Sequence, residues 1–340
     1  MASLDALEEC KGRRKTDVDR YYQTVLLTIG LKDFFDNGNF GCRFVSAEPR
    51  FKEIESNKEI LPDIVLQYNN DDFGILCEIK TSLPAIDFFL LEGLKQLELY
   101  SGKVVGWDTP AKEVLDHDVV LLCHALDSDR IVEKIKEWTN EGKLKVTKNL
   151  CVVEWSIVES LKFDQRDVFL IRHRLGETRC TALNDYLRKN IKIDVDHLFA
   201  KYEKCRFVRK EPPLEYMMNQ LWSSIFPAMH EMTEDFTCTI DEILKITYEY
   251  FIPWSGLQGE YSQVRTRWIK KSMKAFCDIS VAKKIEDSPD GYTILYGKQI
   301  RKDVSEYFVE RLCRKILRES RKRPIKEALE EAQRRLAEFD

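Results

Sequence analysis

Two short apolar segments near residue 70 constrain the fold of this chain most strongly. Residues 61–68, LPDIVLQY, and residues 73–80, FGILCEIK, have the length and bulky side chains of strands, and the polar NNDD segment between them is typical of a hairpin connection. Side chains alternate between the two faces of a strand, so Glu78 and Lys80 project from one face of the second segment. An acid and a base on an otherwise apolar strand favour a chemical role for that face.

The periodicity of apolar residues around these segments predicts an α/β fold. Short apolar runs indicate further strands, and apolar side chains that recur every three to four positions indicate helices. Their alternation predicts a mixed sheet with helices on its faces. The expected strands are residues 42–46, 61–68, 73–80, 118–126, 149–160 and 166–175, and the expected helices are residues 16–36, 85–100 and 128–142.

Chain length and one pair of prolines predict two domains. A chain of 340 residues is longer than a single hydrophobic core usually supports. Residues 205–213, CRFVRKEPP, are polar and end in two consecutive prolines, which interrupt helices and strands alike. We therefore expect a first domain over residues 1–205 and a second domain over residues 214–340.

The cysteines and the absence of long apolar segments suggest a cellular location. The ten cysteines occur singly, without a CxxC pair or histidines at zinc-finger spacing, so neither a disulfide framework nor a zinc site is expected. No apolar leader opens the chain, and no run of 18 apolar residues occurs. These features predict a soluble cytoplasmic protein, with association with the nucleoid as an option, and no membrane partner.

The candidate catalytic residues are Asp63, at the start of the first apolar segment, and Glu78 and Lys80, at the end of the second. Hydrolysis of a phosphodiester is aided by a divalent cation that neutralises charge on phosphorus and supplies hydroxide near neutral pH. Hard Mg²⁺ or Mn²⁺ prefers carboxylate oxygens, which Asp63 and Glu78 would supply, and Lys80 would orient the attacking water. The alternative is that these are ordinary strand-end side chains in a fold that has lost its activity.

This pattern resembles the PD-(D/E)xK nuclease superfamily, whose members carry Pro-Asp on one strand and acid-x-Lys on the next. The matching residues here are Pro62-Asp63 and Glu78-Ile79-Lys80. The resemblance implies a restriction-endonuclease-like fold and a metal shell that includes the main-chain carbonyl of Ile79.

The QLELY segment, residues 96–100, resembles the QxxxY motif of the RecB-like branch of this superfamily. In that branch the Gln and Tyr lie beside the active site and contact the nucleic acid or the catalytic water, which implies these roles for Gln96 and Tyr100. Taken alone, both would be read as surface residues of a helix. Many members also supply an acid or a histidine from the first helix, but no histidine precedes His117, and the available acids are Asp17, Asp19 and Glu48. The choice among these three stays open.

The second domain resembles a winged helix-turn-helix. Helices over 214–232, 241–251 and 262–277 are interspersed with short strands, Thr239 and Glu242 form a capping-box pattern, and Asp290-Gly291 signals a hairpin. The expected nucleic-acid contacts are Arg265, Arg267, Lys270, Lys271 and Lys274 on the helix, and Lys283 and Lys284 on the wing. The alternative is a solvated basic face, or a winged domain that binds protein. Residues 306–339 read as two charged helices.

Charge agrees with a polyanionic partner for the C-terminal part. Residues 261–340 contain 20 Lys and Arg against 13 Asp and Glu, a net of +7, whereas residues 1–260 contain 34 against 45, a net of −11. The preferred hypothesis is a metal-dependent DNA endonuclease of the kind used in restriction, phage defence or mobile-element processing. The alternatives are a non-catalytic DNA-binding regulator on a nuclease scaffold and an RNA-processing nuclease. A homodimer or a partner protein is an open possibility.

Overall fold

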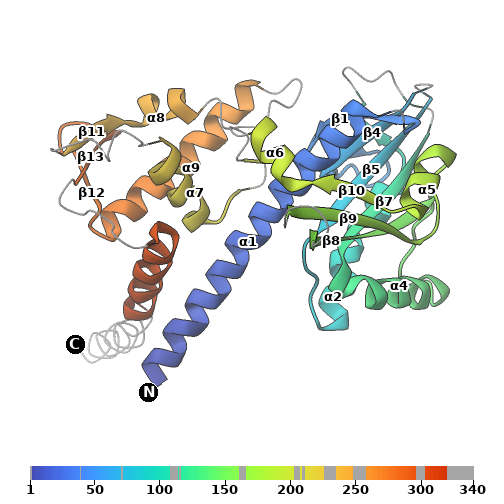
Figure 1. The fold of residues 1–340 in the computed structure, drawn as a ribbon, viewed down its shortest axis with the longest axis horizontal. Coiled ribbons are helices and arrows are strands. Elements are labelled where there is room, and N and C mark those ends of the chain that lie inside the picture. The colour runs from blue at the N-terminus through green and yellow to red at the C-terminus, as the bar shows by residue number, and fades with distance from the viewer. Residues whose placement is uncertain are drawn as a thin grey trace, which may run out of the picture. The chain divides into compact units, whose positions relative to one another are not determined.

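The computed structural model describes residues 2–38, 40–69, 72–107, 114, 116–160, 166–202, 207–208, 211–225, 235–247, 258–295 and 303–319. The chain divides into two compact units (Figure 1). Unit 1 contains Met1–Tyr21, Glu211–Glu249 and Gln258–Asp340, and unit 2 contains Tyr22–Lys210 with Tyr250–Leu257. The first domain expected from sequence, residues 1–205, differs from unit 2 in its first 21 residues. The reason is that helix α1 (Ala2–Asn37) begins well before residue 16, and its first half packs within unit 1.

Unit 2 is built on a seven-stranded mixed sheet in the order β1-β4-β5-β7-β8-β9-β10. The pairs β5–β7 and β7–β8 are parallel, and the other neighbouring strands are antiparallel. The strands are β1 (Cys42–Ala47), β4 (Ile64–Tyr68), β5 (Phe73–Lys80), β7 (Asp116–His124), β8 (Leu150–Ser160), β9 (Arg166–Leu175) and β10 (Ile191–Asp194). The mixed sheet expected from the apolar runs is confirmed.

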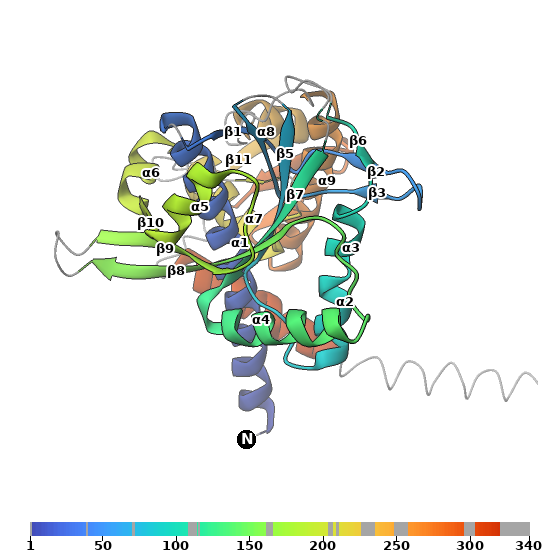
Figure 2. The same cartoon turned by 90° about the vertical axis from the view of Figure 1, so that its right-hand side faces the viewer.

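Helices flank both faces of this sheet (Figure 2). Leu76 of β5 belongs to a core with Leu94 and Tyr100, whereas Cys77 faces Leu31 and Leu187 on the opposite side. The strand therefore alternates as its sequence predicts, because each face meets a separate apolar layer. The helices of the first face are α2 (Asp87–Leu94), α3 (Gln96–Tyr100) and α4 (Ala125–Asn140), and those of the second are the end of α1, α5 (Thr181–Arg188) and α6 (Val195–Lys201).

A second, three-stranded sheet lies within unit 2 in the order β3-β2-β6. It consists of β2 (Phe51–Glu53), β3 (Glu59–Ile60) and β6 (Val104–Val105), and β6 follows α3 closely in the chain. The sequence analysis did not predict it, because strands of two or three residues are too short to show an alternating pattern.

Unit 1 combines helices with a small antiparallel sheet in the order β11-β13-β12. The expected capping box is present, since Thr239 N lies 2.8 Å from Glu242 Oε2 and Glu242 N lies 3.3 Å from Thr239 Oγ1. The elements are α7 (Leu214–Gln220), the π-helical turn η1 (Leu221–Ile225), β11 (Phe236–Thr239), α8 (Ile240–Thr247), α9 (Gln258–Asp278), β12 (Ala282–Lys284), β13 (Gly291–Ile294) and the helical residues 304–319.

Three expected helices of this region extend beyond the described residues. The helix expected over 214–232 is α-helical only to Gln220, and its residues 226–232 lie outside the described part. Residues 248–251 of the helix expected over 241–251 also lie outside the described part. Of the expected C-terminal pair, residues 306–319 are helical and the remainder is not described.

A disulfide joins Cys10 to Cys313 within unit 1, with 5.9 Å between the two Cα atoms. The expectation of a chain without disulfides is therefore wrong. Spacing along the sequence reveals local cysteine frameworks, but these partners are 303 residues apart. Among the helices that the structure describes, none has the length and apolar character needed to span a bilayer.

Candidate active site

The register of β4 and β5 brings Asp63 and Glu78 together. Ile64 pairs with Cys77 in this antiparallel ladder, so the next position places Asp63 opposite Glu78 on the face that α3 covers. The Asp63 carboxylate accepts a hydrogen bond from the main-chain N–H of Ile79 at 2.6 Å. This bond fixes the Asp63 side chain beside the end of β5, as the strand pattern predicts for a paired-acid site.

Four side chains form a closed ring of hydrogen bonds beside Asp63. Lys80 Nζ lies 2.5 Å from Glu78 Oε1 and 3.3 Å from Gln96 Oε1. Gln96 Nε2 donates to the Tyr100 hydroxyl at 2.5 Å, and this hydroxyl lies 2.7 Å from Glu78 Oε2. The one-turn spacing of Gln96 and Tyr100 on α3 thus joins the helix to both strand residues. The structure brings together all five of these residues expected at the site.

Burial explains why Glu78 and Tyr100 are hydrogen-bonded. Glu78 is only 5% exposed and Tyr100 is fully buried, so each needs a hydrogen-bond partner. Burial and the nearby Glu78 carboxylate raise the pKa of Tyr100, which keeps the hydroxyl proton available to a carboxylate. The Leu61 carbonyl oxygen also lies 2.9 Å from this hydroxyl.

Asp63 is the electrostatically strained member of the site. Burial and then the Glu78 carboxylate raise its pKa well above the usual value, although the Ile79 N–H opposes this effect. Two carboxylates in one half-buried place repel each other unless a proton or a cation lies nearby. Lys80 supplies one positive charge beside this pair, and the carboxylate oxygens of Asp63 and Glu78 are the kind of donor that Mg²⁺ prefers.

Of the three acids left open by the sequence, Glu48 lies beside this pair. It follows β1 with a positive φ of 48°, its N–H bonds the Asp63 carbonyl at 3.0 Å, and its charge adds to the rise in the pKa of Asp63. Asp17 and Asp19 are exposed and belong to the half of α1 in unit 1. Glu48 is thus the acid that the unit of the site itself provides.

The fit to a divalent cation rests on two carboxylates. Within the described residues, no group of three His, Cys, Asp or Glu side chains is close enough to enclose a metal ion. Mg²⁺ does not require such a group, because proteins often hold it through one or two carboxylates, with water and substrate phosphate completing the shell. Asp63 and Glu78 meet this requirement, and the Ile79 carbonyl is the adjacent main-chain oxygen.

The seven cations expected to contact nucleic acid do not all lie on the surface. Arg265 is 6% exposed and packs inside unit 1, so its assignment as a surface contact is corrected. Arg265 lies one turn before the buried Trp268 and Ile269, so it shares the buried face of α9. The remaining six are exposed, and they are Arg267, Lys270, Lys271, Lys274, Lys283 and Lys284.

Three of these exposed cations have acidic partners. Arg267 and Lys271 bind Glu211, at 3.1 and 2.7 Å, and Lys270 binds Asp290 at 2.8 Å. Both acids belong to unit 1, and sequence spacing did not reveal them because Glu211 is 56 residues from Arg267. These pairs lower the net positive charge of the α9 face.

One residue beside the site was not singled out from the sequence. His117, at the start of β7, is 3% exposed, and its Nε2 lies 2.6 Å from the main-chain oxygen of Tyr100. Its sequence context, a single histidine between Asp116 and Asp118, carries no signal of this contact.

Comparison with protein-family models, with curated proteins and with solved structures gave no match to this chain.

Proposed function

We propose that this protein is a metal-dependent DNA endonuclease with a PD-(D/E)xK-type active site. The observation that carries the proposal is the closed ring of Glu78, Lys80, Gln96 and Tyr100 next to Asp63. A buried acid, a lysine and a second acid are held together at the adjoining ends of β4 and β5, and this arrangement suits metal-dependent hydrolysis. The mixed sheet flanked by helices is compatible with a restriction-endonuclease-like fold.

Each residue of the site has a role in this proposal. Asp63 and Glu78 would hold Mg²⁺ or Mn²⁺, together with the Ile79 carbonyl, and the bound cation would lower the pKa of water and offset charge on the phosphate. Lys80 Nζ is positioned to donate to the attacking water or to a phosphate oxygen. Gln96 and Tyr100 hold Lys80 and Glu78 in place.

Unit 1 would supply DNA affinity. Its β11-β13-β12 sheet with α8 and α9 supports the winged helix-turn-helix proposal, and Lys274, Lys283 and Lys284 are exposed for phosphate contact. The cations nearer the start of α9 are already paired with Glu211 and Asp290, which supports the protein-binding alternative for that part of the helix. The DNA proposal is retained because three exposed lysines lie on α9 and the adjacent hairpin strand.

The decisive experiment measures cleavage of plasmid, linear duplex, single-stranded DNA and RNA in the presence of Mg²⁺ or Mn²⁺. Asp63→Asn, Glu78→Gln and Lys80→Met should each reduce cleavage at least 100-fold, because each removes a cation ligand or transition-state charge. Asp118→Asn is the matched control, since Asp118 is a fully buried carboxylate on the opposite face of the same sheet. Equal losses in the control variant would assign the effect to folding.

A second measurement detects cation binding independently of cleavage. Mg²⁺ or Mn²⁺ should raise the thermal unfolding midpoint of the wild type, because a ligand that binds only the folded state stabilises it. The rise should vanish in Asp63→Asn and persist in Asp118→Asn. A wild type with no cation effect and no cleavage would favour the non-catalytic DNA-binding regulator, and cleavage confined to RNA would favour the RNA-processing nuclease.

A further inference from the structure

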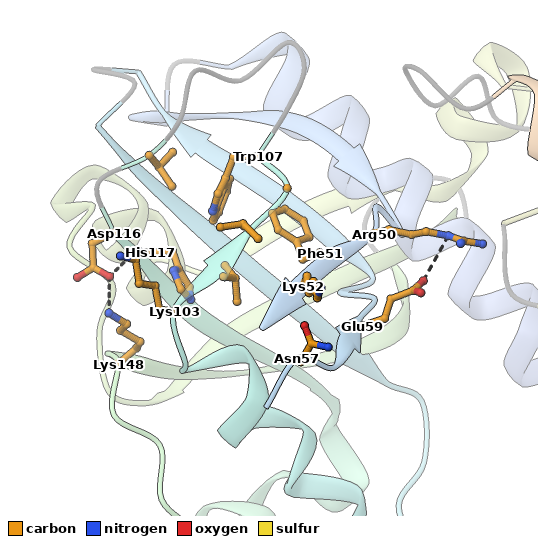
Figure 3. Close-up of a pocket in the computed structure, with 14 residues that line it drawn as sticks. Arg50, Phe51, Lys52, Asn57, Glu59, Lys103, Trp107, Asp116, His117 and Lys148 are labelled. Carbon is orange, nitrogen blue, oxygen red and sulfur yellow. Dashed lines mark hydrogen bonds and ion pairs between the residues drawn. The ribbon is translucent and has the colours of Figure 1, made fainter. Parts of the chain in front are cut away.

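A pocket of about 1080 Å³ opens in unit 2 beside the small sheet (Figure 3). Residues of β2, β3, β6 and the start of β7 line it. Phe51 and Trp107, both buried, form its apolar wall with ring centroids 5.0 Å apart, and Val105 is 42% exposed at its edge. The pocket is large enough for a polar group with an attached ring, and it does not include the catalytic side chains.

The acids of the pocket are already neutralised. Arg50 lies 3.3 Å from Glu59, and Lys148 lies 2.6 Å from Asp116. Figure 3 shows these two ion pairs at opposite sides of the pocket. The lining acids therefore leave no negative charge to attract a cation or to balance further lysines.

Two lysines of the lining carry uncompensated charge. Lys52 and Lys103 are exposed, and in the part of the chain that the structure describes neither forms an ion pair. Lys52 lies on β2, and Lys103 directly precedes β6, the strand that pairs with β2 and places Val105 opposite Lys52. Two cations on one face of a concave surface favour an anion, and phosphate is the anion that a nucleic-acid enzyme meets.

The pocket lies on the same face of the large sheet as the candidate active site. The parallel register pairs His117, which lines the pocket, with Gly74, four residues before Glu78 on β5. At ~3.3 Å per residue this separation is about 13 Å along the strand. His117 also contacts the main-chain oxygen of Tyr100, so a hydrogen bond links the pocket lining to a residue of the ring.

We propose that this pocket binds a backbone phosphate of the nucleic-acid strand roughly four nucleotides from the scissile bond, since a duplex strand advances ~3.4 Å per nucleotide along its axis. The proposal rests on the proposed nuclease function. Lys52 and Lys103 contact the phosphate oxygens, and the apolar edge at Val105 contacts the sugar. The pocket thus sets the register of the strand on the enzyme and lengthens its footprint to one side of the cut.

The test compares the double variant Lys52→Ala/Lys103→Ala with the charge-matched control Lys189→Ala/Lys192→Ala, which removes two exposed lysines from the α5–β10 side of unit 2. Binding of a fluorescently labelled DNA duplex is measured by anisotropy at several salt concentrations in Ca²⁺. Loss of the contact with one backbone phosphate should reduce the slope of log affinity against log salt by about 0.9. The control should retain the wild-type slope. A pocket variant with wild-type affinity and slope would overturn the proposal.

Two further experiments distinguish a strand phosphate from a free phosphate ligand, and failure of the pocket proposal from failure of the nuclease proposal. Calorimetric titration with inorganic phosphate and with a nucleoside monophosphate tests for a free small ligand, and tight binding of either, with duplex binding unchanged in the pocket variant, would overturn the strand assignment. Duplexes shortened on one side of the cut should lose the difference between wild type and pocket variant once fewer than about four nucleotides remain. A wild-type protein that never cleaves would contradict the nuclease function. The salt dependence of DNA binding by the pocket variant would still test whether the pocket contacts DNA.

Discussion

Two buried tyrosines on opposite faces of the large sheet make the same contact with a carboxylate. Tyr100 bonds Glu78 at the candidate active site, and Tyr68 bonds Asp118 at 2.5 Å on the face covered by α5. Tyr68 also accepts a bond from the Cys180 N–H at 3.0 Å. Each pair gives a buried acid a donor. Glu78 lies beside Lys80 and Asp63 at the candidate active site, whereas Asp118 lies beside Arg179, which also pairs with Asp116.

This symmetry gives a matched pair of variants. Tyr100→Phe and Tyr68→Phe should each cost about 1–3 kcal/mol in the free energy of unfolding, because a buried carboxylate loses a donor. Only Tyr100→Phe should also reduce cleavage, by roughly 10- to 100-fold, the usual cost of removing the support of a metal-binding side chain. Urea denaturation and a cleavage assay on both variants make the comparison. Equal activity in the two would reduce Tyr100 to a packing role.

The buried His117 predicts a pH dependence of stability. Burial lowers its pKa below the unfolded-state value of 6.5. As the pH falls through 6.5, this histidine is protonated in the unfolded chain before it is protonated in the folded chain. The free energy of unfolding therefore decreases as the pH falls below 6.5. His117→Gln should flatten the fall in unfolding free energy between pH 7 and pH 5, by at most about 1.4 kcal/mol per pH unit.

At the scale of elements, the sequence predicted those parts of the fold whose pattern is long enough to read. The alternation of β5 correctly placed Glu78 and Lys80 on one face, and the helical spacing of Gln96 and Tyr100 correctly placed them together. The β3-β2-β6 sheet escaped prediction because its strands are too short, and so did α5, β10 and α6, whose apolar positions are few and mixed with charge. Long-range partners, such as Glu211 for Lys271 of α9, leave no trace in local spacing.

The two classes of lysine on unit 1 predict unequal contributions to DNA binding. Lys274→Ala/Lys283→Ala/Lys284→Ala removes exposed cations that have no ion pair within the described residues, and should reduce the salt slope by about 2.7 at ~0.9 per contact. Arg267→Ala/Lys271→Ala removes cations already engaged with Glu211 and should change it by less than half as much. Anisotropy with a labelled duplex measures both. A larger effect of the second variant would assign DNA binding to the other end of α9.

At the scale of the whole molecule, the Cys10–Cys313 disulfide spans nearly the full chain. It lies in unit 1, where Arg14 also forms an ion pair with the buried Glu215. The first half of the long N-terminal helix is therefore held in unit 1 by a covalent bond as well as by packing. Its second half, from Tyr22, belongs to unit 2.

Reduction of this disulfide should weaken unit 1 selectively. A native disulfide contributes about 2–5 kcal/mol, mainly through the unfolded chain. Reductant should lower the unfolding midpoint of the wild type but not that of Cys10→Ser/Cys313→Ser. Cys277→Ser, at a free cysteine of the same unit, should behave like the wild type. Identical melting curves with and without reductant would show that the bond contributes nothing to stability.

Because Cys10 and Cys313 close a covalent ring of about 300 residues, a single proteolytic nick anywhere between them opens the ring without releasing a fragment. A nicked molecule would migrate as one species on a non-reducing gel and separate into two pieces only after reduction. Damage to a surface loop would thus leave both units in one molecule, and the sheet that carries Asp63 would stay tethered to the basic helix of the other unit.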